Sequence, residues 1–516
     1  MKKFFKRFAG ISLVLVMLLS MTAVGFAAEK TITVLQTSDI HGNIYPWAYK
    51  TGEHDDDVGL AKVNSIVKQV KEENPNTLLI DSGDNIQGST LTAIYKDKED
   101  VVHPMMKTMN FMGYDAMVLG NHEFNHGLPT LKRIMNDAKF PILSSNISYK
   151  DDGTLFAKPY VIKEVDGVKV GILGLTTPNI PRWDGDKVAE LQFDGMSETA
   201  QKYVPELKEK GADVIIGLAH AGIEGRHHPT GGDKVGKVAK ENPDIDIIVT
   251  GHDHHEVNTT INDTLIAAPE DKGHQVVRID LELNKENGKW VIANKQARHY
   301  ETYKVEADKD VLEVAKKYHE ATQEYVNTPI GTATGDFVPE DAVRGVPTAQ
   351  IQDTALMDLI NRVQLKYTGA DISSAALFEW GSNIEEGPVS IKDAARIYKY
   401  TNTLYAVEVT GKELKEYMEW SAAYYNTYKS GDVTISFDPD IRGYNYDMFA
   451  GVEYKIDISK PAGERITDLT YNGKPVRDDQ TFTLALNNYR YSGLKSEGMI
   501  SNDPVYKSDK MIRTMI

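Results

Sequence analysis

The sequence has no cysteine among its 516 residues. This absence excludes disulfide bonds, a thiolate nucleophile and thiolate metal ligands. A closed structural zinc site built on cysteine is excluded for the same reason. Any metal chemistry must therefore use histidine, aspartate, glutamate or asparagine, and stability must come from hydrophobic cores.

Long apolar runs are also missing, with one exception at the N-terminus. Residues 8–24 carry no charge, four basic residues precede them, and the small residues Gly25 and Ala27 follow. This pattern is typical of a signal peptide. A membrane anchor is the alternative, but a spanning helix needs about 20 apolar residues and usually a polar stop. We predict that residues 1–27 are removed on export, leaving no membrane span, and that the protein is extracellular, periplasmic or cell-wall associated.

Basic residues are fewer than acidic ones, 58 against 75, so the formal net charge is −17 at pH 7. Such an acidic chain is not expected to bind a nucleic acid polymer through bulk charge. A phosphate-bearing ligand would need a local source of positive charge, which metal ions provide. The length indicates two or three domains at about 150 residues per domain.

The sequence does contain short β-branched runs that alternate with helical patterns. The expected strands are 31–37, 77–80, 116–120, 170–176, 213–219 and 245–251. Helical spacing lies between them, for example at 59–73 and 129–138. Short apolar strands of this kind suit sheets that are covered on both faces. The pattern predicts a layered α/β architecture.

The second half begins after a helical stretch at 308–327. Asp308 or Asp310 is placed to cap its start, and Pro329 lies just beyond its end. It could be an ordinary surface helix, but its position favours a connection. Helices at 355–367 and 411–426 and a strand at 481–488 follow. We divide the chain into a signal peptide (1–27), a first domain (28–307), a linker helix (308–330) and a second domain (331–516).

Five expected strands end in side chains that bind metals or move protons. In chain order these are Asp39 and His41, then Asp84, then Asn121, His122 and Glu123, then His220, then His252 and His254. Taken singly, each is better explained as a turn residue, a satisfied histidine or a surface residue. Because the carboxyl ends of strands in an α/β sheet converge on one crevice, their coincidence indicates a single site.

Oxygen and nitrogen donors of this kind suit two divalent ions of the Mn, Zn, Co or Fe type. A carboxylate that bridges two cations about 4 Å apart would bring water and a phosphoryl oxygen together. The cations would also supply the positive field that the acidic chain lacks. The residues therefore predict a two-metal phosphoesterase site.

These residues resemble the calcineurin-like metallophosphoesterases, in the branch of two-domain 5′-nucleotidases and 2′,3′-cyclic-nucleotide phosphodiesterases. The matching motifs in the first half are "SDIHGN", "DSGDNIQGS", "LGNHEFNHG", "LAHAGI" and "GHDHH". In the second half they are "YKYTNTLYAVEVTGKELKEYMEWSA", "RGYNYDMFAGVEYKIDISKP" and "LALNNYR". The resemblance implies a four-layer α/β/β/α metallophosphoesterase domain, joined by a linker helix to a C-terminal α/β nucleotide-binding domain.

The resemblance also implies a role for each residue at the strand ends. One metal would be held by Asp39, His41, Asp84 and His254, and the other by Asp84, Asn121, His220 and His252. His122 matches a histidine that does not ligate but stabilises the transition state or protonates the leaving alkoxide. Glu123 is expected to support its loop.

Position 125 separates the branches of the family. In the 5′-nucleotidase pattern we expect an aspartate there, which would favour the imidazolium form of His122. Asn125 only orients the ring, and "GNHEFN" is associated with the cyclic-nucleotide phosphodiesterase/3′-nucleotidase branch. On this reasoning, Asn125→Asp should shift the basic limb of the pH–rate profile upward.

The family's second domain holds the nucleotide base between two aromatic rings. Tyr400 and Tyr489 match those positions, and stacking contributes about 1–3 kcal/mol per base. Ordinary packing of tyrosines is the alternative. The family's arginine-bearing glycine loop appears here as "EWGSNIEEG" (379–387). Asn383 replaces a guanidinium in that loop, so we expect a weak grip on a 5′-phosphate.

The sequence thus predicts a secreted, monomeric enzyme that hydrolyses 2′,3′-cyclic nucleotides and 3′-nucleotides to nucleosides and phosphate. A 5′-nucleotidase or nucleotide-sugar hydrolase is the alternative within the family. A non-catalytic surface receptor is the alternative from another class, although all seven ligand positions are filled. Rotation of the second domain about residues 308–330 is expected to bring the base site to the metals.

Overall fold

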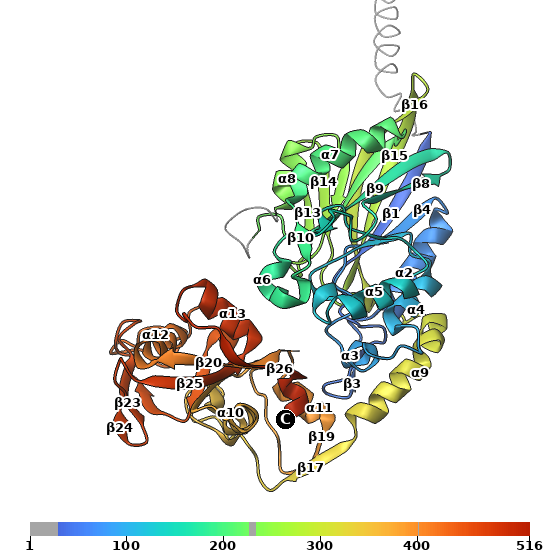
Figure 1. Ribbon diagram of the computed structural model, residues 1–516. Helices are drawn as coiled ribbons and strands as arrows, with labels where there is room; N and C mark the ends of the chain where they lie inside the picture. Colours follow the sequence, from blue (N-terminus) through green and yellow to red (C-terminus); the bar gives the residue numbers. More distant parts are fainter. Residues whose placement is uncertain (1–28, 226–233, 401) are drawn as a thin grey trace, which may run out of the picture.

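The computed structural model describes residues 29–225, 234–400 and 402–516. The predicted signal peptide lies outside these ranges, and so do the adjacent histidines His227 and His228, which the sequence suggests are loop residues without a role at the site. Figure 1 shows two lobes joined by the long helix α9 (Lys309–Val326). Within the described part of the chain, no helix is both long enough and apolar enough to cross a membrane.

The first lobe contains a six-stranded sheet in the order β16-β15-β1-β4-β5-β6. β1, β4, β5 and β6 run parallel, and β15 pairs antiparallel with β1. In chain order the strands are β1 (Lys30–Thr37), β4 (Thr77–Asp81), β5 (Ala116–Val118), β6 (Ile142–Leu143), β15 (Gln275–Glu286) and β16 (Lys289–Glu301). β1, β4 and β5 fall where the sequence predicts strands.

A second six-stranded sheet has the order β13-β14-β12-β11-β9-β8. Its strands are β8 (Tyr160–Val165), β9 (Val168–Thr176), β11 (Val214–His220), β12 (Ile247–Val249), β13 (Val257–Ile261) and β14 (Thr264–Ala268). β9, β11, β12 and β14 are parallel. The predicted strands therefore divide between two sheets.

Alternation of side chains explains how the two sheets stack. Val34 and Ile216 point into the core between the sheets, whereas their neighbours Leu35 and Ile215 point to the outer, helix-covered faces. The first outer layer contains α2 (Leu60–Glu73), α4 (Pro104–Met112) and α5 (Leu128–Asp137). The second contains α7 (Met196–Glu209) and α8 (Val235–Glu241). The lobe is thus a four-layer α/β/β/α domain, as the resemblance implied.

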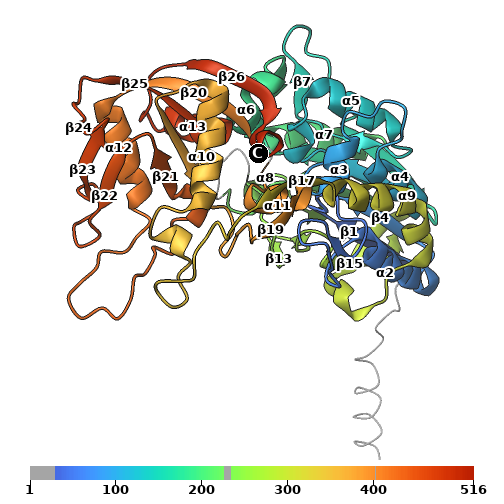
Figure 2. The ribbon, with the colours of Figure 1, turned by 90° about the horizontal axis from the view of Figure 1, so that it is seen from below.

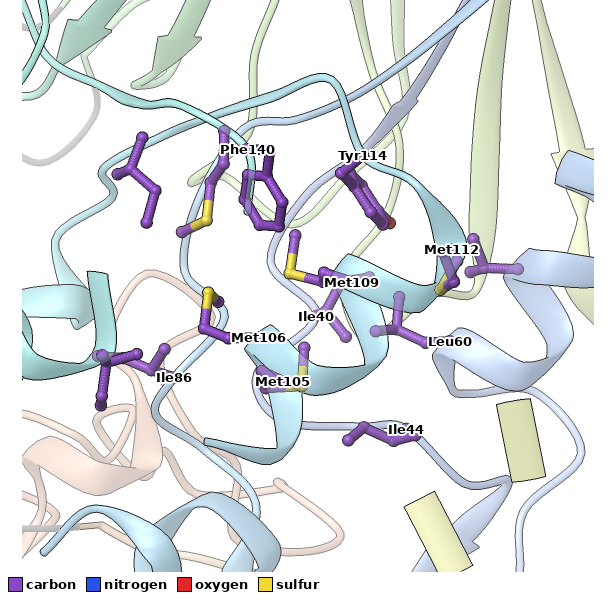
Figure 3. Packing of buried hydrophobic residues seen from close by; sticks show 14 of the residues in the cluster. Ile40, Ile44, Leu60, Ile86, Met105, Met106, Met109, Met112, Tyr114 and Phe140 are labelled. Atoms are coloured by element: carbon purple, nitrogen blue, oxygen red, sulfur yellow. The ribbon is translucent and has the colours of Figure 1, made fainter. Parts of the chain in front are cut away.

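Methionines of α4 fill much of the first outer core. Met105, Met106 and Met109 are fully buried, and they lie in one cluster with Ile40 and Ile44 from the loop after β1 (Figure 3). Unbranched methionine side chains fill irregular gaps well. Burial of Ile40 ties the segment between Asp39 and His41 to this core.

α9 packs on the first lobe along one face. Asp308 caps the helix by accepting a hydrogen bond from the Val311 N–H (3.0 Å). Val311, Ala315 and Val326 belong to the core under α2 and α4. Of the two capping residues that the sequence left open, Asp308 is the one used.

The second lobe is a five-stranded sheet in the order β21-β18-β25-β20-β26 with helices on both faces (Figure 2). The strands are β18 (Ile372–Ala376), β20 (Thr403–Thr410), β21 (Asp447–Ala450), β25 (Thr481–Asn487) and β26 (Pro504–Met511). α10 (Ala355–Thr368) covers one face and α12 (Gly411–Ala422) the other. Shorter helices are α11 (Ile391–Ile397), α13 (Asn488–Ser496) and α14 (Ile512–Met515).

α12 ends four residues before the predicted end at 426. Tyr424 and Tyr425 are both buried among aromatic side chains that include Phe437 and Tyr446. The Tyr425 hydroxyl also donates a hydrogen bond to the carbonyl oxygen of Gln350. Tertiary packing of these tyrosines therefore overrides the local helical pattern.

Candidate active site

The polar strand ends meet where the carboxyl edges of the two sheets of the first lobe come together. Asp39 and His41 follow β1, Asp84 follows β4, and Asn121 follows β5, all in the first sheet. His220 ends β11, and His252 and His254 follow β12, all in the second sheet. The structure thus brings together all seven residues that the sequence singled out, but from two sheets and not from one open crevice.

The backbone is unusual at five of these seven residues. Asp39, His41, Asp84, His252 and His254 have positive φ angles between 50° and 79°. Residues other than glycine adopt this left-handed region infrequently, and such strain clusters at functional sites. The left-handed turns aim these side chains back across the strand ends.

Asp39, His41 and His254 form the first group of donors. Nε2 of His254 lies 3.2 Å from Oδ1 of Asp39 and 3.2 Å from Nε2 of His41. One ligand atom from each residue lies within 4.8 Å of the others. Asp39 also accepts a hydrogen bond from the His252 N–H (3.0 Å), which connects this group to the second one.

Asp84, His220 and His252 form the second group, with ligand atoms again within 4.8 Å of one another. Nε2 of His220 lies 3.0 Å from Oδ2 of Asp84 and 3.1 Å from Oδ1 of Asn121. A third such group of His41, Asp84 and His122 overlaps both. Asp84 therefore lies centrally in the whole cluster.

Partners around the cluster orient its members. The carbonyl oxygens of Gln87 and Ser82 lie 2.9 Å and 2.6 Å from Nδ1 of His41 and His220. Because a carbonyl oxygen only accepts, each Nδ1 carries a proton, and Nε2 is the nitrogen that each ring turns toward the cluster, where a proton or a cation can bind. The fully buried Glu123 accepts backbone N–H bonds from Asp84, Asn85 and Gly120 at 2.7–2.8 Å. Its carboxylate supports the loops, as the sequence suggested.

Two glycines make room for the carboxylates. A Cβ on Gly120 would lie 2.2 Å from Oδ1 of Asp84. A Cβ on Gly251 would lie 2.4 Å from Oδ2 of Asp39 and 1.8 Å from the Ser38 hydroxyl. Any larger side chain at either position would displace a carboxylate of the cluster.

The electrostatics of the cluster favour positive charge within it. Burial raises the pKa of Asp39, but His254 and His220 outweigh it and hold the pKa below its ordinary value. The pKa of Asp84 is likewise well below the ordinary value, because His220 and His122 outweigh burial. Burial lowers the pKa of His220, but Asp84 outweighs it and raises the pKa to about 10. Protons and metal ions compete for such sites.

These residues fit divalent cations. The cluster offers carboxylate oxygens, imidazole nitrogens and an amide oxygen, which is the donor set of Mn, Zn, Co or Fe sites. The lone pair on Nε2 of His41 points at a second ring nitrogen 3.2 Å away. A cation bound between the rings of His41 and His254 would accept this lone pair.

His122 lies beside this cluster, with its side chain one-third exposed. Its backbone N–H donates to Oδ1 of Asp84 (2.7 Å), and its Nε2 lies 4.0 Å from Oδ2 of Asp84. Nδ1 lies 2.7 Å from Oδ1 of Asn125. The amide of Asn125 in turn donates to both carboxylate oxygens of Asp184, at 3.1 Å and 3.0 Å. Sequence reasoning missed Asp184, which lies 59 residues from Asn125 in "PRWDGDK" and belongs to no motif.

The predicted base-stacking residues lie in the second lobe. The Tyr400 ring contacts Phe378 and Tyr444 edge-on, with centroids 5.0 Å and 6.4 Å apart. Burial raises the pKa of Tyr400 to about 12, with smaller effects from Tyr444 and Tyr489. Tyr489 is 46% exposed. Tyr444 lies within the motif "RGYNYDMFAGVEYKIDISKP", but sequence reasoning did not single it out, because its approach to Tyr400 depends on tertiary packing.

Asn383 is engaged by its own lobe. Its Oδ1 accepts a hydrogen bond from the Val338 N–H (2.8 Å), and its carbonyl oxygen accepts one from Arg396 (2.6 Å). These bonds hold the glycine loop in place. Its predicted contact with substrate stays a prediction.

The two lobes meet close to the donor cluster of the first lobe and to Tyr489 of the second lobe. Trp183 and Arg182 of α6 (Ile180–Asp184) line a cavity of about 190 Å³ together with Trp420, Tyr489 and Arg490 of the second lobe. The Trp183 ring lies 5.6 Å from the ring of His252. Lys507 and Asp186 also form an ion pair across the interface (2.9 Å). α6 therefore contacts both the donor cluster, through Trp183 and His252, and the second lobe.

Comparison with known proteins identifies both lobes. Residues 32–256 match the calcineurin-like phosphoesterase family, and residues 329–500 match the 5′-nucleotidase C-terminal domain. The 2′,3′-cyclic-nucleotide 2′-phosphodiesterase/3′-nucleotidase of Salmonella typhimurium is 32% identical, with 92% of this chain and 83% of that protein covered. The trifunctional nucleotide phosphoesterase protein YfkN of Bacillus subtilis is also 32% identical over 90% of this chain, which spans only 36% of that longer protein.

A solved structure from Staphylococcus aureus, provisionally named a 5′-nucleotidase, superposes on both lobes. Its TM-score is 0.80 at 28% identity, with 94% of this chain and 96% of that chain covered. The agreement extends over the phosphoesterase lobe, α9 and the second lobe. The chain therefore belongs to the family of two-domain calcineurin-like phosphoesterases that carry a 5′-nucleotidase C-terminal domain.

Proposed function

We propose that this chain hydrolyses 2′,3′-cyclic nucleotides, and then the resulting 3′-nucleotides, to nucleosides and phosphate. The observation that carries the proposal is the convergence of seven strand-end donors, with Asp84 at their centre and His122 beside them. Membership of the phosphoesterase family makes the chain a hydrolase of phosphoester bonds. The choice of substrate is supported by Asn125 and by the name of the Salmonella relative.

We assign two divalent cations to the cluster, consistent with the use of such ions by calcineurin-like phosphoesterases. Asp39, His41, Asp84 and His254 would hold one, and Asp84, Asn121, His220 and His252 the other. When bound, such ions polarise the phosphoryl group and activate water. The ions are of the Mn, Zn, Co or Fe type.

His122 performs the proton transfer. In the first reaction water adds to phosphorus, the P–O2′ bond breaks, and the 2′ oxygen takes a proton. In the second reaction a second water molecule adds to phosphorus, the P–O3′ bond breaks, and the 3′ oxygen takes the proton. Nε2 of His122 faces the cluster, so it is placed to donate that proton in both reactions. Asn125 holds the ring through Nδ1.

The second lobe binds the nucleoside. Tyr400 and Tyr489 stack on the base, and stacking accepts every base because each has a π face. Asn383 replaces a guanidinium and leaves a 5′-phosphate weakly held. Residues 331–516 would form this domain, residues 28–307 the catalytic domain, and residues 308–330 the hinge that brings them together. If cross-linking the domains left kcat unchanged, rotation would play no part.

A substrate panel tests the proposal. We expect kcat/KM with Mn²⁺ to be higher on 2′,3′-cyclic AMP and 3′-AMP than on 5′-AMP, and a chelator to abolish all three activities. A clearly higher kcat/KM on 5′-AMP than on the other two substrates would refute the proposal in favour of a 5′-nucleotidase or nucleotide-sugar hydrolase. An inactive protein with full metal content would favour a non-catalytic receptor.

Cell fractionation tests the proposed export. We infer that residues 1–27 direct the chain out of the cytoplasm and are cleaved, and that the mature protein is a monomer. N-terminal sequencing of the exported protein should begin near residue 28. An intact N-terminus on a membrane-bound protein would favour the anchor instead.

A further inference from the structure

Asp184 is a buried carboxylate next to the segment after β5 that carries His122 and Asn125. Its side chain is 2% exposed, at the end of α6. Its polar neighbours are the Asn125 amide (3.0 Å and 3.1 Å) and the Lys187 ammonium group (3.3 Å). Lys187 also donates a hydrogen bond to the carbonyl oxygen of Asn125 (2.7 Å). Asp184 and Lys187 thus hold Asn125 from its side chain and its backbone.

The carboxylate determines which way the Asn125 amide points. A carboxylate only accepts hydrogen bonds, so the NH₂ group of Asn125 must face Asp184. The amide oxygen is then left facing Nδ1 of His122 at 2.7 Å. An oxygen without a proton there requires Nδ1 to be the protonated nitrogen of the neutral ring. Nε2 is consequently the nitrogen that exchanges a proton with the reacting group.

We propose that Asp184 is a positioning residue that sets the tautomer and orientation of His122 through the Asn125 amide. This role rests on the proposed function for its kinetic readout. It also explains how asparagine can serve at position 125, because the carboxylate that orients the histidine lies one side chain further out. A third group that orients a catalytic imidazole is a recurrent arrangement in enzymes.

The contact with Asp184 changes what the substitution of Asn125 by aspartate would test. With aspartate at 125, a second carboxylate oxygen would lie about where the amide nitrogen now lies, 3.0 Å from Asp184. Two carboxylates at that distance do not both ionise readily. The single substitution therefore no longer isolates the effect of a carboxylate on His122. The exchange of both residues, N125D/D184N, does so, because the amide introduced at position 184 then donates to the carboxylate introduced at position 125.

Kinetics of Asp184 variants test the proposal. D184L removes the acceptor of the Asn125 amide, and we expect kcat on 3′-AMP to fall roughly tenfold with KM changed less than about twofold. D184N keeps one amide oxygen that can still accept from Asn125, so its kcat should fall less. The loss of kcat cannot exceed the whole contribution of His122 as a general acid, which is about 10²–10⁴-fold. Asp186→Asn is the matched control, because Asp186 is 87% exposed and pairs with Lys507. Its kcat should stay within twofold of the wild-type value.

Two further measurements separate positioning from folding. In the zinc-loaded protein with ¹⁵N-labelled histidine, the His122 signals should show a protonated Nδ1, and D184L should lose this signature while circular dichroism stays unchanged. The exchange N125D/D184N should restore kcat to within about threefold of wild type. Unchanged kcat in D184L, a neutral His122 ring in the wild type that carries its proton on Nε2 and none on Nδ1, or no recovery in the exchange variant would each overturn the proposal. A wild-type protein inactive on 3′-AMP would instead refute the proposed function, and the His122 spectrum would still test the positioning role.

Discussion

Replacing Gly120 by alanine tests whether Asp84 holds metal at the position seen here. Gly120 does not lie in the left-handed region, so its backbone accepts alanine without strain. The added Cβ would lie 2.2 Å from Oδ1 of Asp84, 2.7 Å from its backbone nitrogen and 2.8 Å from Cγ. The new methyl group thus meets the whole Asp84 residue and not only a flexible end.

The required displacement exceeds what a metal site tolerates. Non-bonded atoms in contact lie about 3.5 Å apart, so the carboxylate oxygen has to move by about 1.3 Å. Metal–ligand distances hold within about 0.2 Å. Asp84 is 1% exposed, and its carboxylate already accepts the His122 N–H, so no alternative position is open. We expect kcat to fall at least about 100-fold and bound metal to be lost.

The assay is metal content per chain after dialysis, measured with kcat on 3′-AMP. Overpacking costs about 1–3 kcal/mol, which a protein of ordinary stability survives. Gly195→Ala is the matched control, because its Cβ would also lie 2.2 Å from a carboxylate oxygen, that of Glu198. The Glu198 side chain is 60% exposed and pairs with Lys237 at the surface, so it can turn away, and metal content and kcat should not change. A Gly120→Ala protein with full metal and normal kcat would refute the placement of Asp84.

Three other perturbations have definite expected outcomes. Tyr489→Ala should raise KM for 3′-AMP by about 5–150-fold through lost base stacking of about 1–3 kcal/mol, and should leave KM for bis(p-nitrophenyl) phosphate unchanged; equal effects on both substrates would contradict stacking. Arg490→Met leaves the buried Asp447 carboxylate unpaired, so urea denaturation should show a loss of about 3–5 kcal/mol. Burial lowers the pKa of His103 to about 3, so between pH 6.5 and pH 3 the unfolded chain binds a proton that the folded chain excludes. The free energy of unfolding should therefore fall as pH drops from 7 to 5, and less steeply in His103→Phe; parallel curves would contradict this.

The strand-end residues were predictable from sequence because their signal is local. A β-branched run such as 213–219 that ends in His220 shows both the strand and the donor within eight letters. The same holds for β1 with Asp39 and β4 with Asp84. The division of these strands between two sheets was not visible, since it depends on pairing between distant segments. Only the family resemblance pointed to the second sheet.

Residues that act through long-range contacts escaped prediction for the same reason. Asp184 bonds to Asn125 across 59 residues, and nothing near "RWDGD" marks it as functional. Tyr444 approaches Tyr400 from a short 3₁₀ turn at Gly443–Asn445. The end of α12 was predicted too late because the aromatic packing of Tyr424 and Tyr425 is a tertiary effect.

The strain at the site and the rigidity of its surroundings are connected. Five donors with positive φ each cost on the order of 1 kcal/mol, so together they consume a large fraction of an ordinary folding free energy of about 5–15 kcal/mol. Such turns persist only where packing leaves no alternative. Ile40, Ile86 and Leu119 are buried beside Asp39, Asp84 and Asn121, respectively, and anchor the three loops of the first sheet. The core therefore holds the donors in place, whereas Asp184 reaches His122 only through side-chain hydrogen bonds. Metal binding should thus be robust to changes at Asp184, and catalysis should not.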